Sequence, residues 1–404
     1  MRVLVMNSGS SSQKTALFEV SDAADTDPIA PLWQGKIQWD GKKESLTIKN
    51  WQGAKIEKES SAGDQQASIE AMLRELWDGK TAVLQSPSEI SVTGHRIVHG
   101  GPKLTLPAII TPEVKQTIDE VATIAPLHNR AGLRGVQVAE KLLGEIPQVA
   151  VFDTGFHRTL PLAEIVYAGP YEWYEQGIRR YGFHGINHEY CAHRVARLMC
   201  KDISSLKIIS CHLGSGCSLA AVEHGQSVAT TMGFTPMEGL MMGTRSGSID
   251  PGILTHLMRT GNVQSEQLDQ TLNHRSGLLG ISGVSSDMRD VLEAIKSGNE
   301  RAKLAFDIFV HRLQAGIGAM AASLNGLDAL VFTAGIGENS PEVRLTACEK
   351  LGFLGVRLDE KKNSTANADI CISGEDSAIP VYVIGAQEEW SIARECARIG
   401  LPNS

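Results

Sequence analysis

The chain has 404 residues, which is long enough for a sizeable core and two domains. A hydrophobic share of 42% and a charged share of 21% are typical of a soluble globular protein, and a net charge of −8 disfavours broad binding to nucleic acid or anionic membranes. No apolar stretch is long enough to cross a bilayer, the N-terminus lacks a signal-peptide layout, and the seven cysteines include no CxxC pair. We therefore expect a cytoplasmic protein with reduced thiols and no structural zinc.

The chain opens with a hydrophobic strand that runs into a short Gly/Ser turn and leaves as a second strand, Val3 to Val20. Asn7 ends the first strand, and Gly9 is followed by small hydroxyl residues. Such a turn exposes backbone N–H groups with little side-chain bulk in the way, so a phosphate can approach closely. A single turn of this kind is a weak signal, because most are ordinary hairpins.

Strands and helices alternate through the rest of the first half. Thr111 and Pro112 begin a helix with an N-cap threonine and a first-position proline, and this helix must end before Pro126. The other predicted elements are short strands over Trp33–Ala67, a helix near Ala67–Leu76, and strands over Ser91–Gly101 and Gln148–Asp153.

The second half repeats this design. A second strand–turn–strand runs from Lys207 to Gly225, with His212 at the strand end and Gly214 in the turn. The elements predicted after the Gly/Met-rich segment Thr231–Gly252 are helices over Pro251–Thr260 and Glu300–Asn325, a strand over Ala329–Thr333, the loop GIGEN, a helix from Ser340, a strand over Pro380–Gly385, and a helix opening with Glu388.

This alternation indicates an α/β protein. Two similar Gly/Ser turns, one in each half, suggest a duplicated architecture for binding phosphate. No low-complexity linker separates the halves, so we expect the active site in a cleft between two domains.

Two known phosphate-binding motifs do not fit the turns. GSSSQKT, residues 9–15, has one residue too few between Gly and Lys for a Walker A loop, and a predicted strand follows where that loop requires a helix. GSGCSL, residues 214–219, lacks the third glycine of a dinucleotide-binding or protein-kinase loop.

Polar residues at predicted strand ends and in Gly-rich loops remain as candidates: Arg96, Asp153, His184, Arg245, Glu338 and Asn339. Each has a purely structural alternative. The arginines could be surface residues, His184 a hydrogen-bonded core histidine, and Asp153 a helix cap. GIGEN could be a tight turn, although a position between a buried strand and a helix N-terminus is where nucleotides bind in α/β folds.

A series of motifs resembles the acetate kinase family, in the same order along the chain: NSGSSSQK, HRIVHGG, APLHN, VAVFDTGFH, RRYGFHG, HLGSG, TMGFTPMEGLMMGTRSG, SSDMRD, FTAGIGENS and QEE. They extend from Asn7 to Glu389. The resemblance places the chain in the superfamily of acetate and sugar kinases, heat-shock chaperones and actin. It implies two ribonuclease-H-like domains, residues 1–152 with 387–404 and residues 153–386, and a homodimer.

The implied reaction is reversible phosphoryl transfer from ATP to acetate, giving acetyl phosphate and ADP, with Mg²⁺ or with Mn²⁺ in its place. A carboxylate is already ionised at pH 7, so the difficulty is repulsion between two anions, which calls for arginines, a metal and an imidazole donor. By resemblance, Arg96 and Arg245 hold the acetate and the transferring phosphoryl group. His184 stabilises that group, and Asp153 orients an arginine or the metal shell.

The same resemblance implies the other site residues. Asn7 and Glu388 lie at the Mg²⁺ site, partly through water. The nucleotide-binding residues are Ser10, Ser12 and Lys14 in the first turn, His212, Leu213, Gly214, Ser215 and Gly216 in the second, and Asp287, Met288, Arg289, Gly335, Ile336, Gly337, Glu338 and Asn339 on the adenosine side. The pocket for the methyl group consists of Val98, Leu127, Phe183 and Pro236.

Several positions depart from the family pattern. Ser215 stands where Asn is usual, which puts the phosphate donor in question, with pyrophosphate or another nucleotide conceivable. Ile186 and Asn187 replace Thr-Ser, Ser248 replaces Asp, and Gln387 precedes the acidic pair where Asp or Asn is common. None of these changes removes a charged catalytic residue.

Two other functions stay open. Val98 leaves less room than the alanine of propionate-preferring relatives, which favours acetate without excluding propionate, so a propionate kinase is one alternative. The other is a nucleotide-binding ATPase switch on the same fold. Such a switch needs the phosphate-binding turns but not the arginines, the histidine and the apolar pocket.

Overall fold

The computed structural model describes residues 1–9, 12–21, 27–122, 126–261 and 263–399, with the backbone alone for residues 126–128. The chain forms two compact units, the first Met1–Gly155 with Gln387–Ser404 and the second Phe156–Ala386. Asp153 thus belongs to the first unit, although the sequence-based boundary was set directly before it. None of the helices in the described part of the chain is long and apolar enough to span a membrane.

The first unit contains an eight-stranded sheet in the order β5-β4-β3-β2-β1-β6-β8-β7. Its strands are β1 (Arg2–Ser8), β2 (Ser12–Glu19), β3 (Trp33–Asp40), β4 (Lys43–Asn50), β5 (Lys55–Ser61), β6 (Val92–Ile97), β7 (Ala108–Ile109) and β8 (Gln148–Phe152). The strands β5 to β1 pair antiparallel, whereas β1, β6 and β8 run parallel. The carboxyl ends of β1, β6 and β8 therefore meet at one edge.

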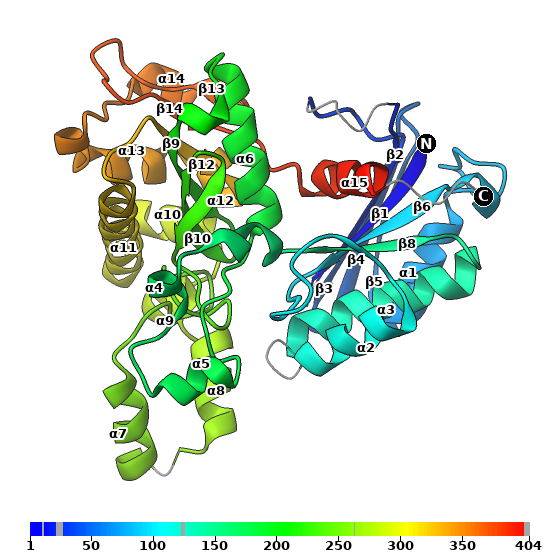
Figure 1. Ribbon diagram of the computed structural model, residues 1–404, viewed down its shortest axis with the longest axis horizontal. Helices are drawn as coiled ribbons and strands as arrows, with labels where there is room; N and C mark the ends of the chain where they lie inside the picture. The colour runs from blue at the N-terminus through cyan, green and yellow to red at the C-terminus, as the bar shows by residue number, and fades with distance from the viewer. Residues whose placement is uncertain (10–11, 22–26, 123–125, 262, 400–404) are drawn as a thin grey trace. The chain divides into compact units, whose positions relative to one another are not determined.

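Helices cover both faces of this sheet (Figure 1). The helices of the first unit are α1 (Gln65–Arg74), α2 (Pro112–Val121), α3 (Pro126–Leu143) and α15 (Glu388–Arg398), with the short 3-10 helix η1 (Pro87–Glu89). Leu4 and Trp33 pack with Met72 of α1 and Val138 of α3 in one core cluster. On the opposite face lies α15, whose Trp390 ring is 5.7 Å from the Phe18 ring, centroid to centroid. The last helix of the chain thus completes the first unit.

The second unit has a six-stranded sheet in the order β11-β10-β9-β12-β14-β13. Its strands are β9 (Lys207–Leu213), β10 (Cys217–Glu223), β11 (Gln226–Thr230), β12 (Ala329–Thr333), β13 (Ile370–Cys371) and β14 (Val381–Val383). Here too, antiparallel strands β11, β10 and β9 are followed by parallel strands β12 and β14. The strand order of β3-β2-β1-β6-β8 is therefore repeated, as the two Gly/Ser turns suggested.

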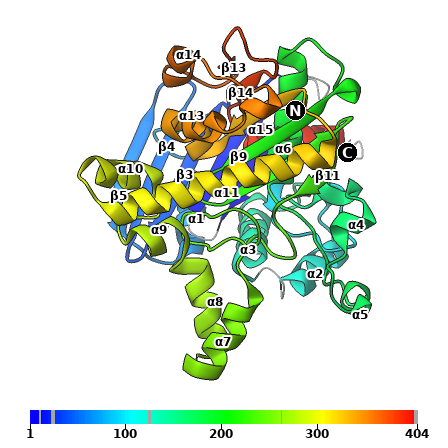
Figure 2. The ribbon, with the colours of Figure 1, turned by 90° about the vertical axis from the view of Figure 1, so that its left-hand side faces the viewer.

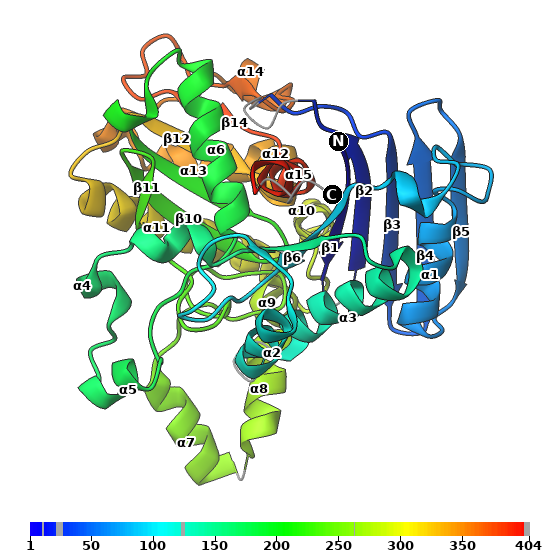
Figure 3. The same ribbon diagram turned by 45° about the vertical axis from the view of Figure 1, so that its right-hand side comes forward.

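The helices of the second unit are α4 (Leu162–Ile165), α5 (Tyr171–Glu175), α6 (Gly185–Leu198), α7 (Pro251–Gly261), α8 (Ser265–His274), α9 (Gly277–Ser282), α10 (Met288–Lys296), α11 (Glu300–Leu324), α12 (Ala334–Asn339), α13 (Pro341–Glu349) and α14 (Glu360–Ser364), with 3-10 helices η2 (Gly155–Thr159), η3 (Ile203–Ser205) and η4 (Gly352–Leu354) at its edges. The long helix α11 crosses one face of the sheet, and α6 covers the other (Figure 2). The pair α7 and α8 projects from the rest of this unit (Figure 3).

One predicted loop is a helix. GIGEN forms α12, because the chain leaves β12 through Ala334 in the left-handed region, at φ +65°, and then closes helical turns, with Ser340 N donating to Ile336 O at 2.9 Å. Two long helices, α3 and α6, were not predicted. The helix α6 has no side-chain cap and begins directly after His184, which is itself left-handed at φ +56°, so its sequence carries no start signal.

Candidate active site

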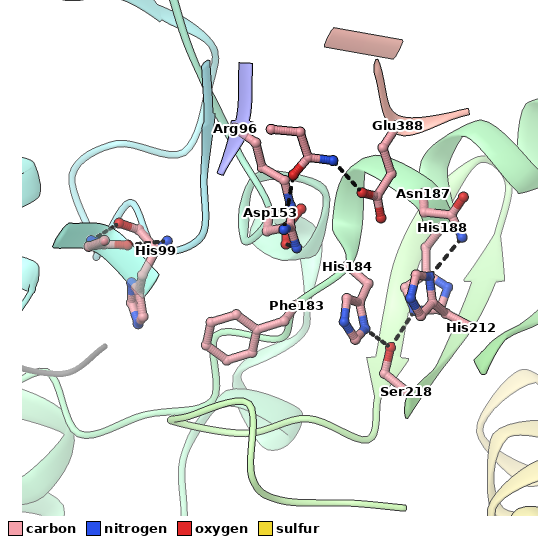
Figure 4. Close-up of polar contacts among 12 residues, drawn as sticks. Arg96, His99, Asp153, Phe183, His184, Asn187, His188, His212, Ser218 and Glu388 are labelled. Carbon is pink, nitrogen blue, oxygen red and sulfur yellow. Dashed lines mark hydrogen bonds and ion pairs between the residues drawn. The ribbon is translucent and has the colours of Figure 1, made fainter. Parts of the chain in front are cut away.

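In the first unit, polar side chains gather where β1 ends (Figure 4). Asn7 is buried, and its Nδ2 donates to Glu388 Oε2 at 3.0 Å and to Glu389 Oε1 at 2.9 Å. Both glutamates lie in the first turn of α15, where the positive end of the helix dipole stabilises carboxylates. Asn7 Oδ1 accepts from Arg96 Nη1 at 3.3 Å. A single amide therefore links a pair of carboxylates to an arginine.

Arg96, in β6, pairs through Nη2 with Asp153, which follows the neighbouring parallel strand β8 and has a side chain only 1% exposed. Burial alone would lower the pKa of Arg96, but the carboxylates of Asp153 and the two glutamates outweigh it and hold this pKa above its ordinary value. The guanidinium is thus fixed in place and fully charged.

The first Gly/Ser turn lies beside this group. Gly9 N donates to Ser12 O at 2.7 Å, which closes the turn, while Ser10 lies outside the described residues. Lys14 stands opposite Asn7 in the β1–β2 pair, and its Nζ is 3.9 Å from Glu389 Oε1. The predicted residues Asn7, Ser12 and Lys14 therefore lie at one end of the hairpin.

The donor set at this end suits Mg²⁺. Glu388 Oε2 and Glu389 Oε1 both lie within 3.0 Å of the same Asn7 nitrogen, so two carboxylate oxygens converge. Magnesium prefers oxygen ligands and keeps several of its waters, so it requires few protein ligands. Among the described residues, no group of three or more His, Cys, Asp or Glu side chains could hold a metal. The residues present fit a cation that stays largely hydrated.

Val98 follows β6 and is buried. Its neighbour His99 is held by Asn129 of α3 in both directions, because His99 N donates to Asn129 Oδ1 at 3.0 Å and Asn129 Nδ2 donates to His99 O at 2.9 Å. The helix α3 thereby fixes the backbone beside Val98. The side chain of Leu127 lies outside the described part of the chain.

In the second unit, His184, His188 and His212 form what we call the imidazole cluster (Figure 4). The rings of His184 and His212 stack with their centroids 3.9 Å apart and an angle of 10° between their planes. Ser218 Oγ lies 2.9 Å from His184 Nδ1 and 2.8 Å from His188 Nε2. The two predicted histidines are therefore held face to face.

His188 was not singled out in the sequence, although it follows His184 by one helical turn. Its Nδ1 lies 2.9 Å from Ser210 Oγ. Burial, together with the neighbouring His157 and His212, holds the pKa of His188 well below its ordinary value. A neutral His188 between two serine hydroxyls orients Ser218, and through it His184.

The second Gly/Ser turn packs directly on this cluster. A Cβ atom on Gly216 would stand 2.5 Å from Arg245 Nη2 and 3.4 Å from His184 Cε1, and a Cβ atom on Gly214 would stand 3.5 Å from His212 Nε2. Glycine at these positions leaves room for the arginine and the two rings. The structure thus brings these five residues together within one unit.

Arg245 Nη1 donates to the backbone carbonyl of Pro236, one of the predicted pocket residues. Burial lowers the pKa of Arg245, with Cys217 opposing the shift, but an arginine stays protonated at neutral pH. Phe183, another pocket residue, is buried, and its carbonyl lies 3.0 Å from His157 Nε2. Both pocket residues of this unit are therefore held by the groups around the cluster.

A network that the sequence did not reveal fixes the Gly/Met-rich segment. Arg180 Nη2 donates to Glu238 Oε1 at 2.7 Å, and Tyr167 Oη donates to Glu238 Oε2 at 2.5 Å. Phe234 N donates in turn to Tyr167 Oη at 2.8 Å. Phe234 and Glu238, which lie on either side of Pro236, are thus tied to Tyr167 and Arg180.

The short helix α12 packs on the same turn. A Cβ atom on Gly337 would stand 3.7 Å from Leu213 Cβ, and one on Gly214 would stand 3.7 Å from Ala334 Cβ. Glu338 Oε1 accepts from Ala386 N at 2.9 Å, which ties α12 to the end of the unit. The predicted adenosine-side residues Gly335, Ile336, Gly337, Glu338 and Asn339 all belong to this helix.

Arg344, which sequence reasoning missed, holds α12 in place. It is 1% exposed, and its Nη1 donates to Gly337 O at 2.9 Å and Glu338 O at 2.8 Å. Its Nε donates to Asn363 Oδ1 at 2.8 Å. A buried guanidinium therefore binds the last carbonyl groups of α12 and joins them to α14.

The remaining adenosine-side residues form the start of α10. Asp287 caps this helix by accepting from Arg289 N at 2.9 Å, and Arg289 Nη2 pairs with Asp287 Oδ2 at 2.6 Å. Met288 is 2% exposed, so its side chain lies in the core. Gly243 N donates to Ser215 O at 3.1 Å, and a Cβ atom on Gly243 would stand 3.0 Å from the carbonyl oxygen of Ser286, the residue before the cap. The second turn therefore lies between α12 and the start of α10.

Comparison with known proteins identifies relatives over nearly the whole chain. Residues 2–394 match the Acetokinase family. An acetate kinase of Trichormus variabilis is 55% identical over 399 residues, which cover 98% of each chain. The crystal structure of Porphyromonas gingivalis acetate kinase has a TM-score of 0.88 and 41% identity, covering 98% of this chain and 99% of that one. A propionate kinase from Francisella tularensis has a TM-score of 0.88 and 37% identity, covering 98% of both.

These similarities confirm the predicted fold class. Both units carry the same strand order, and solved acetate and propionate kinase structures superimpose on almost the full length of the chain. Family membership makes the chain a phosphotransferase. On its sequence and its fold alike, the chain belongs to the acetokinase family.

Proposed function

We propose that this chain catalyses reversible, Mg²⁺-dependent transfer of a phosphoryl group from ATP to acetate, giving acetyl phosphate and ADP. Membership of the acetokinase family supports the reaction class. The observation that carries the proposal is the set of fixed cationic and imidazole groups at two glycine turns: Arg96 with Asp153 in one unit, and Arg245 with His184 in the other.

In this reaction an oxygen of the acetate carboxylate attacks the γ-phosphorus of ATP. The bond from that phosphorus to the oxygen bridging the β-phosphate breaks, and the electron pair leaves with ADP. The carboxylate is ionised at neutral pH and needs no general base. Because two anions must meet, catalysis depends on positioning and on neutralising charge.

The fixed arginines suit that task. We assign Arg96 and Arg245 to the acetate carboxylate and the transferred phosphoryl group, and Asp153 to holding Arg96 in position. His184, whose Nδ1 contacts Ser218, donates to an oxygen of the phosphoryl group in transit. These are the catalytic groups of the proposal.

The two turns and their neighbours bind the nucleotide. The first turn, with Ser10, Ser12 and Lys14, takes the γ-phosphate, and the second takes the inner phosphates. Magnesium, when bound, neutralises phosphate charge, and Asn7 and Glu388 would hold it, partly through water. The adenosine lies against α12 and the start of α10, with Met288 contributing only its backbone, since its side chain is in the core.

Propionate is the second candidate substrate. A Francisella propionate kinase is 37% identical to this chain, so the family includes both activities. Val98 is buried and the backbone of the next residue, His99, is held by Asn129 of α3, which favours a small pocket for the methyl group. Acetate is the preferred substrate, and propionate reacts more slowly.

We further propose a cytoplasmic homodimer. All seven cysteines are free thiols, five of them buried, as suits a reducing compartment. The projecting helix α7 exposes Ile253, Leu257 and Met258, an apolar face suited to a second copy of the chain. Light scattering of the wild type and of Leu257→Glu tests this assembly, with a dimer expected for the first and a monomer for the second. A monomeric wild type would contradict it.

The decisive assay measures acetyl hydroxamate formed from ATP, Mg²⁺ and acetate in the presence of hydroxylamine, with controls lacking acetate. We expect hydroxamate only when all three are present. An ATPase switch on the same fold would instead release ADP at a rate indifferent to acetate, and that result would overturn the proposal.

A further inference from the structure

We propose that Asn187 fixes the tautomer of His212, so that a neutral imidazole presents its Nε2–H group to the second glycine turn. Asn187 is a positioning residue that acts through His212. The proposed function enters only in what His212 then binds, which is an inner phosphate of the nucleotide.

The orientation of the Asn187 amide follows from its neighbours. It is fully buried on α6, with Nδ2 at 2.9 Å from His212 Nδ1 and 3.3 Å from Thr333 Oγ1. On its other side, Cys191 Sγ lies 3.8 Å from Oδ1. Burial raises the pKa of the Cys191 thiol to about 12, so the sulfur carries a proton that it can donate to this oxygen. In the structure the oxygen of the amide faces Cys191, whose thiol can donate to it, and the nitrogen faces His212.

An amide nitrogen can only donate, so His212 Nδ1 must be the acceptor and carry no proton. In a neutral imidazole the proton is then on Nε2. This atom lies toward the second turn, 3.5 Å from where a Cβ atom on Gly214 would stand. The glycine turn and the Nε2–H donor thus face the same space.

The surroundings of His212 also favour its neutral form. Its ring stacks on His184 at 3.9 Å, and His188 stands edge-on with centroids 6.1 Å apart. Two stacked cations at this distance would repel each other, so the stacking disfavours charge on both rings at once. Asn187, which donates to Nδ1, also opposes protonation of this nitrogen.

A serine hydroxyl in place of the Asn187 amide could donate or accept, so it would select no tautomer. The fixed Nε2–H donor of His212 offers a hydrogen bond to a phosphate at the second turn.

Nitrogen-15 NMR of histidine in the ligand-free protein tests the tautomer, with His212→Gln to assign the resonances. We expect an unprotonated Nδ1 and a protonated Nε2 in the wild type, and a proton on Nδ1 in the isosteric Asn187→Asp. Should Asn187→Asp fail to fold, Asn187→Ser is expected to show both tautomers. A wild-type proton on Nδ1, or a spectrum that neither substitution changes, overturns the inference.

Binding of ADP, measured by calorimetry without acetate, tests the consequence. In Asn187→Asp, at a pH above the pKa of His212, the neutral imidazole carries its proton on Nδ1, so its Nε2 faces the phosphate as an acceptor. At low pH the imidazolium donates from both nitrogens. We therefore expect Asn187→Asp to bind ADP about as tightly as the wild type at pH 6. At pH 8.5 we expect it to bind ADP about three- to tenfold more weakly, which is the effect of losing one neutral hydrogen bond.

A ratio that does not change with pH would show a merely structural role for Asn187. Asn50→Asp, at a buried asparagine of the first unit, controls for the general effect of adding a carboxylate and should leave ADP affinity unchanged. Neither measurement requires turnover, so a failure of this inference can be distinguished from a failure of the proposed transfer to acetate.

Discussion

Arg96 is the residue on which the charge balance of the first unit depends, because its guanidinium joins Asn7, Asp153 and the two glutamates of α15. We expect Arg96→Ala to lower kcat/KM for acetate by about 10²- to 10³-fold, since a fixed donor to the transition-state charge is lost. Steady-state hydroxamate kinetics measure this. Arg74→Ala, at an exposed arginine of α1, is the control, and near-native activity of Arg96→Ala would contradict the assigned role.

Val98 carries the prediction on substrate choice. The backbone of the next residue, His99, is held by Asn129, so shortening the Val98 side chain should open space rather than shift the chain. We expect Val98→Ala to raise the kcat/KM of propionate relative to acetate by about tenfold, in the range that one methylene is worth in an apolar pocket. Rates with both acids decide the matter, and an unchanged ratio removes Val98 from the pocket.

At the scale of elements, α12 depends on one buried cation. In Arg344→Met, the carbonyls of Gly337 and Glu338 and the Asn363 side chain lose their donors. We expect a loss of about 3 kcal/mol of stability and a higher KM for ATP, because α12 packs on the second turn. Urea unfolding and ATP kinetics test this against Arg312→Met, at an exposed arginine of α11. Equal stability of the two variants would show that Arg344 does not hold α12.

The elements also show what local sequence can predict. Both hairpins, α2 with its Thr111 cap, and β12 follow from hydrophobic runs and capping residues, and the structure confirms them. The helix α6 begins directly after His184 and α12 begins at Ala334, both residues with positive φ, and no side-chain cap marks either start. Their starts depend on tertiary packing, which a local pattern does not contain.

The same limit applies to the site. Arg96, His184 and Arg245 can be chosen from motifs, but their supporting groups cannot. Ser218 and Arg344 come from distant segments, and His188, one helical turn after His184, matters only through buried hydrogen bonds. The roles of all these residues remain predictions until the variants are measured.

At the scale of the whole molecule, buried histidines should make the protein sensitive to acid. Burial lowers the pKa of His95 and of His157 to about 4, from an ordinary 6.5. The unfolded state therefore binds more protons between these values, so stability falls as the pH drops from about 6.5 to 4, by about 3 kcal/mol for each group.

Urea unfolding at pH 7.5 and pH 5 checks this prediction. The urea midpoint should be lower at pH 5 than at pH 7.5. His95→Gln, which keeps a donor toward Gln148, should reduce the difference between the midpoints at the two pH values. Equal urea midpoints at pH 7.5 and pH 5 would show that these histidines do not control the acid response.

The central claim is direct transfer of a phosphoryl group to a carboxylate, and phosphorus-31 NMR of one reaction mixture tests it most directly. With wild-type protein, ATP, Mg²⁺ and acetate, we predict that the resonance of acetyl phosphate grows in step with that of ADP, and that both stay absent without acetate. Growth of inorganic phosphate and ADP alone, with or without acetate, would contradict the account.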